Sequence, residues 1–120
     1  MSYKIKYEDR TSYLYVHIEG PESYDEASRF WEELRNEAEL QKQDRFLIVD
    51  EVTGVLDLND VYWLSAKIAT LFYGKVIAYV DPKEESYVAN EFGESVVSGK
   101  GVKVRLFKNE KEAVEWLHKV

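Results

Sequence analysis

Acidic side chains follow the apolar segments of this sequence in a pattern that can serve a metal ion. Asp50 and Glu51 end one apolar run, Asp57 and Asp60 precede a helical segment, and Asp81 ends a second apolar run. If the runs are parallel strands, these carboxylates meet at one edge of a sheet, where their oxygens suit Mg²⁺. Aspartate is also an ordinary helix cap, so we expect no cofactor. A metal-dependent enzyme stays an alternative, which calorimetric titration with Mg²⁺ or Mn²⁺ tests.

Residues for nucleophilic catalysis or phosphate binding are few. The sequence has no cysteine, and His17 and His118 lie far apart with no adjacent serine, so no catalytic triad is indicated. Ser98-Gly99-Lys100-Gly101 follows a helical segment and precedes an apolar run, which is the reverse of a phosphate-binding loop. We therefore expect a non-catalytic protein.

A glycine interrupts the helical segment around Asn90 to Glu94. Gly93 costs a helix interior about 1 kcal/mol relative to alanine, so a packing or functional reason is expected for it. Close helix packing is the first interpretation. The alternative is a polar patch of Asn90, Glu91 and Glu94 that faces a ligand or partner.

Length and charge limit the classes of partner. The 120 residues are 45% hydrophobic, which is enough for one domain, residues 1–120, with its own core. The 16 basic and 23 acidic residues give a net charge of −7, which argues against a nucleic-acid partner. No apolar run approaches the roughly 20 residues of a membrane span, and the first ten residues lack the apolar part of a signal peptide. We expect a cytoplasmic protein without integral membrane association.

Hydrophobic patterning predicts nine elements. Apolar or alternating runs predict strands at Tyr3–Tyr7, Tyr13–Glu19, Phe46–Asp50, Val76–Val80 and Val102–Phe107. Capping residues predict helices that begin at Ser23, Asp57, Asp81 and Asn109. We expect Val88, Phe92 and Val96 to form the buried stripe of the third helix, and Trp31 and Trp116 to be buried in the core.

The element order predicts an α/β fold with a single five-stranded mixed sheet. The strand order is 1-2-3-4-5 with the first strand antiparallel, because consecutive βα units form right-handed parallel crossovers. In-order winding puts the helices largely on one face, and it provides no reversal of the kind where α/β sheets bind ligands. The other face, with Tyr13, Tyr15 and His17, is therefore expected to be covered by a second copy or a ligand.

The second helix is apolar on more than one side. Val61, Leu64 and Ile68 keep core spacing, whereas Tyr62 and Trp63 fall on the opposite side of the helix. Tryptophan and tyrosine are the residues that most often anchor protein interfaces. We expect Tyr62 and Trp63, with Asp57 and Asp60 at the helix start, to form a protein-contact surface.

Two segments resemble the SpoIIAA-like proteins of the STAS superfamily. They are Phe46-Leu47-Ile48-Val49-Asp50, followed by Thr53-Gly54, and the closing run from Leu106 to Leu117, LFKNEKEAVEWL. With the element order, the resemblance covers nearly the whole chain and implies a fold shared with CRAL-TRIO lipid-transfer domains. In STAS proteins that antagonise anti-sigma factors, a serine at the start of the helix after the third strand is phosphorylated. Leu56–Asp60 has no serine or threonine, so that switch does not carry over, although an acidic residue there would imitate a permanently modified form.

The resemblance implies a cytoplasmic interaction or regulatory module without catalytic activity. We expect it to be a homodimer or to bind a different protein. The alternative is a binder of a small apolar or lipid-like ligand, which the relation to CRAL-TRIO domains and the abundance of tyrosine favour. An enclosed apolar cavity would support that alternative.

Overall fold

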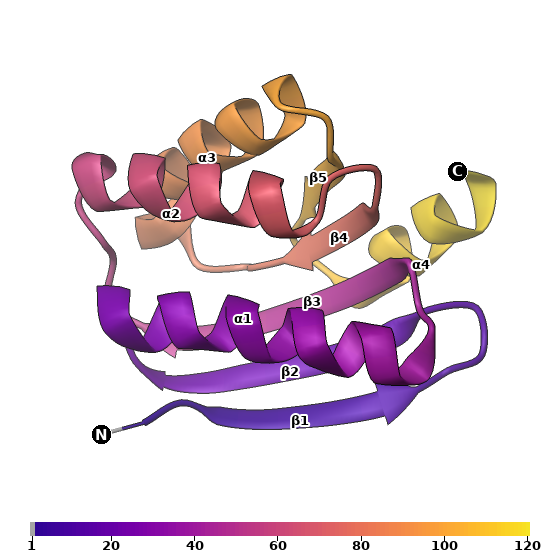
Figure 1. Cartoon of the computed structure of the whole chain (residues 1–120). Helices are drawn as coiled ribbons and strands as arrows, with labels where there is room; N and C mark the ends of the chain where they lie inside the picture. The colour runs from indigo at the N-terminus through magenta and orange to yellow at the C-terminus, as the bar shows by residue number, and fades with distance from the viewer. Residues whose placement is uncertain (1) are drawn as a thin grey trace.

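The chain folds into one sheet with helices on both faces (Figure 1). A computed structural model of the protein describes residues 2–120. Its strands are β1 (Lys4–Asp9), β2 (Leu14–Pro21), β3 (Arg45–Thr53), β4 (Val76–Val80) and β5 (Lys103–Phe107). Its helices are α1 (Tyr24–Gln41), α2 (Leu58–Leu71), α3 (Tyr87–Gly99) and α4 (Glu110–Lys119), with a 3₁₀ turn η1 (Glu84–Ser86) before α3. None of the helices within residues 2–120 combines the length and apolar character that a membrane crossing requires.

The sheet has the predicted strand order, β1-β2-β3-β4-β5. β1 pairs with β2 in antiparallel orientation as a hairpin, and every other pair is parallel. β3 is the central strand, and its residues from Phe46 to Asp50 are all buried. The apolar run in the sequence reflects this position, because a parallel strand covered on both faces has no solvent side for polar residues.

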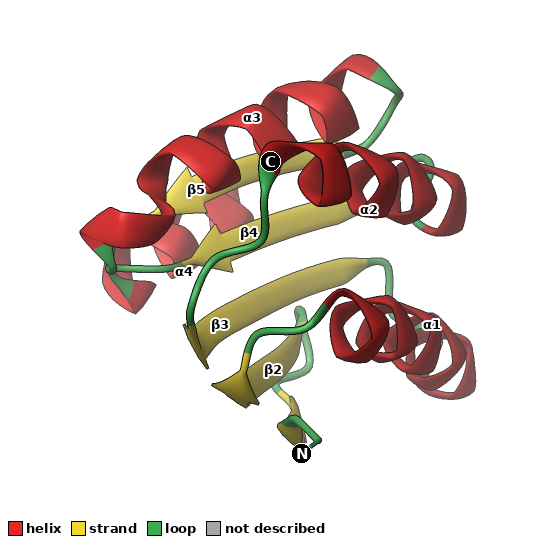
Figure 2. Cartoon of the chain, turned by 90° about the vertical axis from the view of Figure 1, so that its left-hand side faces the viewer, coloured by secondary structure: helices red, strands yellow, loops and turns green. Residues whose placement is uncertain are grey.

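Three helices cover one face of the sheet and α4 covers part of the other (Figure 2). The prediction that helices lie largely on one face is confirmed, and α4 is the exception. The handedness rule applies to a crossover between two parallel strands. In the described chain α4 leads to no further strand, so it is free to pack its Ala113 and Leu117 beside Leu47 and Ala78 on the opposite face.

The larger core lies between the sheet and the helices α1 to α3. Trp31 is buried, as predicted, and its ring packs edge-on to Phe30 and Phe72 with ring centroids 5.1 and 5.6 Å away. Trp116 is only partly buried, although we expected it to be a core residue. It lies against Phe107 at 5.6 Å between centroids. Because α4 is the only helix on this face of the sheet, no neighbouring helix covers its flank, and Trp116 on that flank stays partly in contact with solvent.

The buried side of α3 differs from the predicted one. Val88 is exposed, and Phe92 and Val96 are partly buried, while Ala89 and Val97 are the buried residues. We expected the helix to begin next to Pro82, but η1 comes first and the α-helix begins at Tyr87. A 3₁₀ turn has three residues per turn in place of 3.6, so it shifts the residue positions that face the core.

Candidate functional site

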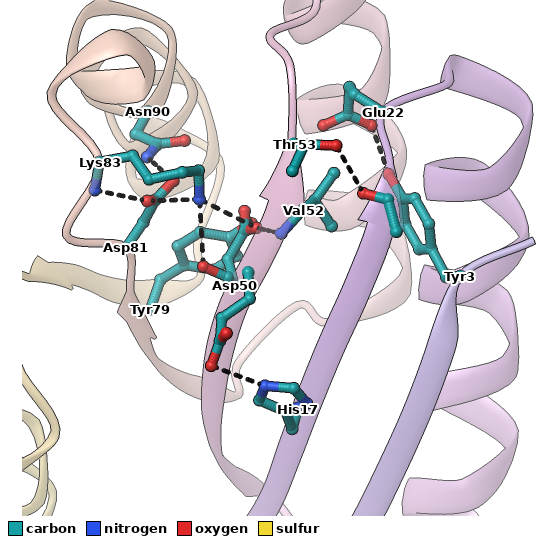
Figure 3. Close-up of polar contacts among 12 residues, drawn as sticks. Tyr3, His17, Glu22, Asp50, Val52, Thr53, Tyr79, Asp81, Lys83 and Asn90 are labelled. Atoms are coloured by element: carbon teal, nitrogen blue, oxygen red, sulfur yellow. Dashed lines mark hydrogen bonds and ion pairs between the residues drawn. The ribbon is translucent and has the colours of Figure 1, made fainter.

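Two buried carboxylates share one lysine where β3 and β4 end (Figure 3). Lys83 Nζ lies 2.8 Å from Asp81 Oδ1 and 3.6 Å from Asp50 Oδ1. Asp50 follows the apolar run of β3, and Asp81 directly follows β4. Because the two strands are parallel, both side chains lie at the same edge of the sheet, where the strands end. We call Asp50, Tyr79, Asp81, Lys83 and Asn90 the ionic cluster.

Hydrogen bonds hold each carboxylate of the ionic cluster in a fixed orientation. Asp50 accepts from the Tyr79 hydroxyl at 2.5 Å and from the Val52 N–H at 2.8 Å. Asp81 accepts from the Lys83 N–H at 3.0 Å and from the Asn90 amide at 2.8 Å. This turn at Asp81 replaces the helix cap that we predicted there.

Burial sets the acidity of these groups. It raises the pKa of the Asp50 carboxyl above its ordinary value, and the bond from Tyr79 offsets only part of this effect. Burial also raises the pKa of Tyr79, and the nearby Asp50 charge adds to the increase. For Lys83, burial lowers the pKa, but the bond to Asp81 and the charge of Asp50 outweigh it, so the pKa is raised and the amine stays protonated. Two carboxylates for one cation leave the cluster with an excess of negative charge.

A tyrosine–carboxylate pair, Tyr3 and Glu22, lies one strand away from the ionic cluster. The Tyr3 hydroxyl donates to Glu22 Oε1, which also accepts from the Ser23 N–H at 2.9 Å. The Glu22 N–H in turn donates to the Thr53 carbonyl at 2.8 Å, which fixes Glu22 beside the end of β3. Burial raises the pKa of the Glu22 carboxyl, with a further increase from the Asp50 charge, and it raises the pKa of Tyr3 as well.

A cavity of about 110 Å³ lies between the sheet, α2 and α3. Glu22, Asp50, Tyr79 and Asp81 line its polar part, and apolar side chains line the rest. The sequence analysis identified Asp50 and Asp81 but missed Glu22, Tyr79 and Lys83. A signal was present for Lys83, because a lysine two residues after Asp81 can fold back to it. No local pattern links Tyr3 to Glu22, which are 19 residues apart.

Of the five acidic residues of the predicted edge, only Asp50 and Asp81 come together. Glu51 points to the opposite face of the sheet and lies 2.9 Å from His17 Nε2. Asp57 caps α2 by accepting from the Asp60 N–H at 2.8 Å. Within residues 2–120 no group of three or more histidine, cysteine or acidic residues is arranged to hold a metal ion.

Tyr13, Tyr15 and His17, which we expected to be covered by a second copy or a ligand, lie on one face of the sheet at β2. They are not equally exposed to such a partner. Tyr13 is buried beneath α4, with its ring 6.4 Å from that of His118. The prediction that a second copy or ligand covers Tyr13 is wrong, because the chain's own α4 does so. Tyr15 has the Arg10 guanidinium 4.0 Å from its ring centroid, and His17 contacts Glu51. Both remain partly exposed.

Residues Asn90, Glu91 and Glu94 each have an intramolecular partner. Asn90 binds Asp81, Glu91 accepts from the Tyr87 hydroxyl at 2.8 Å, and Glu94 accepts from the Leu106 N–H at 2.9 Å. They line a cleft of about 330 Å³ at the ends of β4 and β5. The strand order has no reversal, as the sequence analysis predicted, although α3 and α4 leave these neighbouring strands toward opposite faces.

Close packing accounts for Gly93. A Cβ atom at this position would lie 3.2 Å from Ser65 Oγ and 3.4 Å from Val61 Cγ1, both on α2. The glycine therefore allows α3 to approach α2 closely, as the first interpretation predicted. Across α2 from this contact, Tyr62 and Trp63 stay exposed, with ring centroids 5.2 Å apart.

Comparison with known proteins places the fold. No protein-family model matches the sequence, and no curated protein matches it. A serine-to-glutamate variant of RsbS from Moorella thermoacetica matches 97% of this chain and 96% of that chain, with a TM-score of 0.65 and 19% identity. The protein TM1081 matches 95% and 88%, with a TM-score of 0.59 and 14% identity. A DUF3478-family protein from Shewanella loihica PV-4 with a SpoIIAA-like fold matches 97% and 94%, with a TM-score of 0.57 and 20% identity. The predicted resemblance is confirmed in its architecture: this chain has the SpoIIAA-like fold.

Proposed function

We propose that the protein is a non-catalytic interaction module of the STAS type and that it forms a homodimer through α2 and the start of α3. The observation that carries the proposal is the distribution of exposed apolar side chains. Within residues 2–120, eight large hydrophobic residues are exposed, and all except Leu40 lie between residues 55 and 88. They are Val55, Leu58, Tyr62, Trp63, Tyr73, Tyr87 and Val88.

Tyr73 lies against Gly101, and Tyr87 lies in the cleft beside Lys108. The exposed residues of α2, Leu58, Tyr62 and Trp63, with Val55 before it and Val88 at the start of α3, define what we call the α2–α3 surface. α2 and α3 pack against each other at Gly93 and Ser65, so their outer sides are adjacent. Concentrated apolar exposure of this kind marks interaction sites on soluble proteins. Trp63 is 57% exposed and has Tyr62 at its edge, which is the pairing of residue types that most often anchors an interface.

Charge determines how such a homodimer responds to salt. Each copy carries a net charge of −7, and Asp57 and Asp60 lie at the start of α2 beside the apolar residues. Two copies repel each other, and salt screens this repulsion over about 10 Å at 0.1 M. Self-association therefore strengthens as salt increases, whereas docking of a basic partner on the same surface weakens.

Control by phosphorylation at the start of α2 is not part of this proposal. Leu56–Asp60 contains no serine or threonine. The carboxylate of Asp57 is already occupied as the helix cap. The surface is thus available without a covalent switch at that position.

Trp63→Glu tests the proposal by sedimentation equilibrium between about 1 and 200 μM. We expect self-association to weaken at least about 30-fold, which corresponds to roughly 2 kcal/mol for an interface anchor. Leu40→Glu is the matched control, because Leu40 is also apolar and is even more exposed, at 79%, but lies on α1. Circular dichroism checks that both variants fold. A wild-type protein that stays monomeric at 200 μM, or a Leu40→Glu variant that loses as much association, contradicts the proposal.

The alternative of a lipid ligand receives little support from the cavity. Pockets for small molecules usually measure about 300–1,000 Å³, and the space under α2 and α3 is about 110 Å³. An acyl chain does not fit this volume without separation of the helices.

A further inference from the structure

The two edges of the sheet differ in how much backbone they leave unpaired. β5 forms one edge, and α3 lies against it. Directly before β5 the Val102 N–H donates to the Val97 carbonyl at 3.4 Å, and within β5 the Leu106 N–H donates to Glu94 Oε2 at 2.9 Å. Covering an edge strand with a helix is one of the usual ways to keep other strands from pairing with it. We call this side the protected edge.

β1 forms the other edge, and no element lies beyond it (Figure 1). The Arg10 N–H donates to the Tyr13 carbonyl at 3.0 Å. Hydrogen-bonded and non-hydrogen-bonded pairs alternate along an antiparallel ladder, so the even-numbered residues of β1 bond to β2. The backbone groups that face outward belong to the odd-numbered residues, Ile5, Tyr7 and Asp9. Within residues 2–120 these outward groups have no backbone partner, so β1 is an open edge.

The side chains of β1 differ between the two faces of the sheet. Ile5 and Tyr7 pack against the larger core. Lys4, Lys6 and Glu8 lie on the opposite face and are exposed. Glu8 contacts Arg10 at 3.1 Å, whereas neither lysine forms an ion pair within residues 2–120. A strand added at the open edge therefore meets apolar side chains on one face and two unpaired positive charges on the other.

Charge argues against a second copy of β1 as the added strand. A two-fold dimer pairs β1 with its copy in antiparallel orientation about a central residue. Three such registers keep Ile5 paired. Centred on Ile5, the register sets Lys4 opposite Lys6; centred on Lys6, it sets two Lys6 side chains opposite each other. Centred on Tyr7, it sets Lys4 opposite Arg10. Like charges directly opposite each other destabilise a strand pair, so each register carries a penalty.

We propose that the open edge binds an extended peptide segment of another protein by strand addition. Backbone bonds at Ile5 and Tyr7 provide affinity, and alternate side chains provide specificity. The segment runs antiparallel to β1, because antiparallel pairing is slightly more stable per residue. Its pattern is base, apolar, acid, apolar, acid. The base lies opposite Glu8 and the acids lie opposite Lys6 and Lys4. This site does not involve the α2–α3 surface.

The peptide acetyl-Thr-Lys-Val-Glu-Val-Glu-amide tests the proposal by titration into the full chain at pH 7. We expect saturable shifts of the Ile5 and Tyr7 amide resonances in ¹⁵N-resolved NMR spectra. The Val104 amide, on the protected edge, should not shift. N-methylation of both valines removes the N–H groups that face β1, and it should weaken binding at least about tenfold. N-methylation of both glutamates alters N–H groups that face away, and it should weaken binding less than about threefold.

Charge reversal in the protein tests the pattern of side chains. Lys4→Glu/Lys6→Glu should bind this peptide at least about tenfold more weakly and should prefer acetyl-Thr-Lys-Val-Lys-Val-Lys-amide. Lys100→Glu/Lys103→Glu is the matched control, because it makes the same charge change at exposed lysines of the protected edge. It should change affinity less than about twofold. The NMR spectrum of each variant shows whether it folds.

Four results would overturn the proposal. One is the absence of saturable shifts at Ile5 and Tyr7. Another is an equal loss of affinity for the two pairs of lysines, and a third is an equal loss for methylated valine and methylated glutamate. The fourth is a shift of the Ile5 and Tyr7 amides with protein concentration in the absence of peptide, which would show that a second copy occupies the open edge.

Discussion

Replacing Lys83 with methionine tests whether the ionic cluster depends on its one cation. The substitution keeps the length of the side chain and removes its charge. Asp81 and Asp50 then lose their partner, although their side chains are only 2% and 9% exposed. Both carboxylates must either stay charged in a poorly solvated site or take up a proton.

The expected loss follows from the burial of the partners. Breaking a buried ion pair by removing one member costs about 3–5 kcal/mol. Lys83 itself is 25% exposed, which places the loss near the lower limit, at about 3 kcal/mol. Protonation sets an upper limit, since raising one carboxyl pKa from about 4 to neutral pH costs about 4 kcal/mol. For a domain of this size, about 3 kcal/mol lowers Tm by roughly 12 °C.

Lys75→Met is the matched control. The side chain of Lys75 is 24% exposed, nearly the same fraction as that of Lys83. Its Nζ lies 2.6 Å from Asp44 Oδ1, but Asp44 is 75% exposed. Loss of a pair with an exposed partner should cost less than about 1 kcal/mol. Urea unfolding followed by circular dichroism at pH 7 measures both variants, and unchanged m-values show that the transitions are comparable. Equal losses for the two lysines would refute the argument that the buried partners determine the cost.

Two further predictions concern the cores and the titrating groups. Trp31→Ala should cost about 3–5 kcal/mol and Trp116→Ala only about 1–2 kcal/mol in urea unfolding, because the second ring is partly solvated already; equal costs contradict the assigned burial. Burial raises the pKa of Asp50 and Glu22 in the folded protein, so the folded state binds more protons than the unfolded state above the ordinary carboxyl range. These two groups should therefore make the free energy of unfolding decrease as pH rises through their raised pKa values. Unfolding measured from pH 4 to 7 should show a smaller decrease in Asp50→Asn, and an identical pH profile contradicts the assignment.

Much of the architecture follows from local sequence patterns. The apolar runs Phe46–Asp50 and Val76–Val80 identify strands covered on both sides, and the hairpin at the start of the chain leaves one arrangement for the first two strands. Right-handed crossovers then give the strand order without further information. Trp31 could be assigned to the core because helical spacing shows which side of α1 is apolar.

Tertiary contacts decided the features that local patterns leave open. The face that α4 covers depends on where apolar area of the sheet is unburied, since no crossover constrains this helix. The inward side of α3 depends on the turn at Asp81 and on the close approach of Gly93 to α2. The pairing of Lys83 with Asp50 joins residues 33 positions apart. Sequence periodicity reports the environment of a single element, whereas the candidate site forms where several elements end together, so only the packed structure brings its charges into one place.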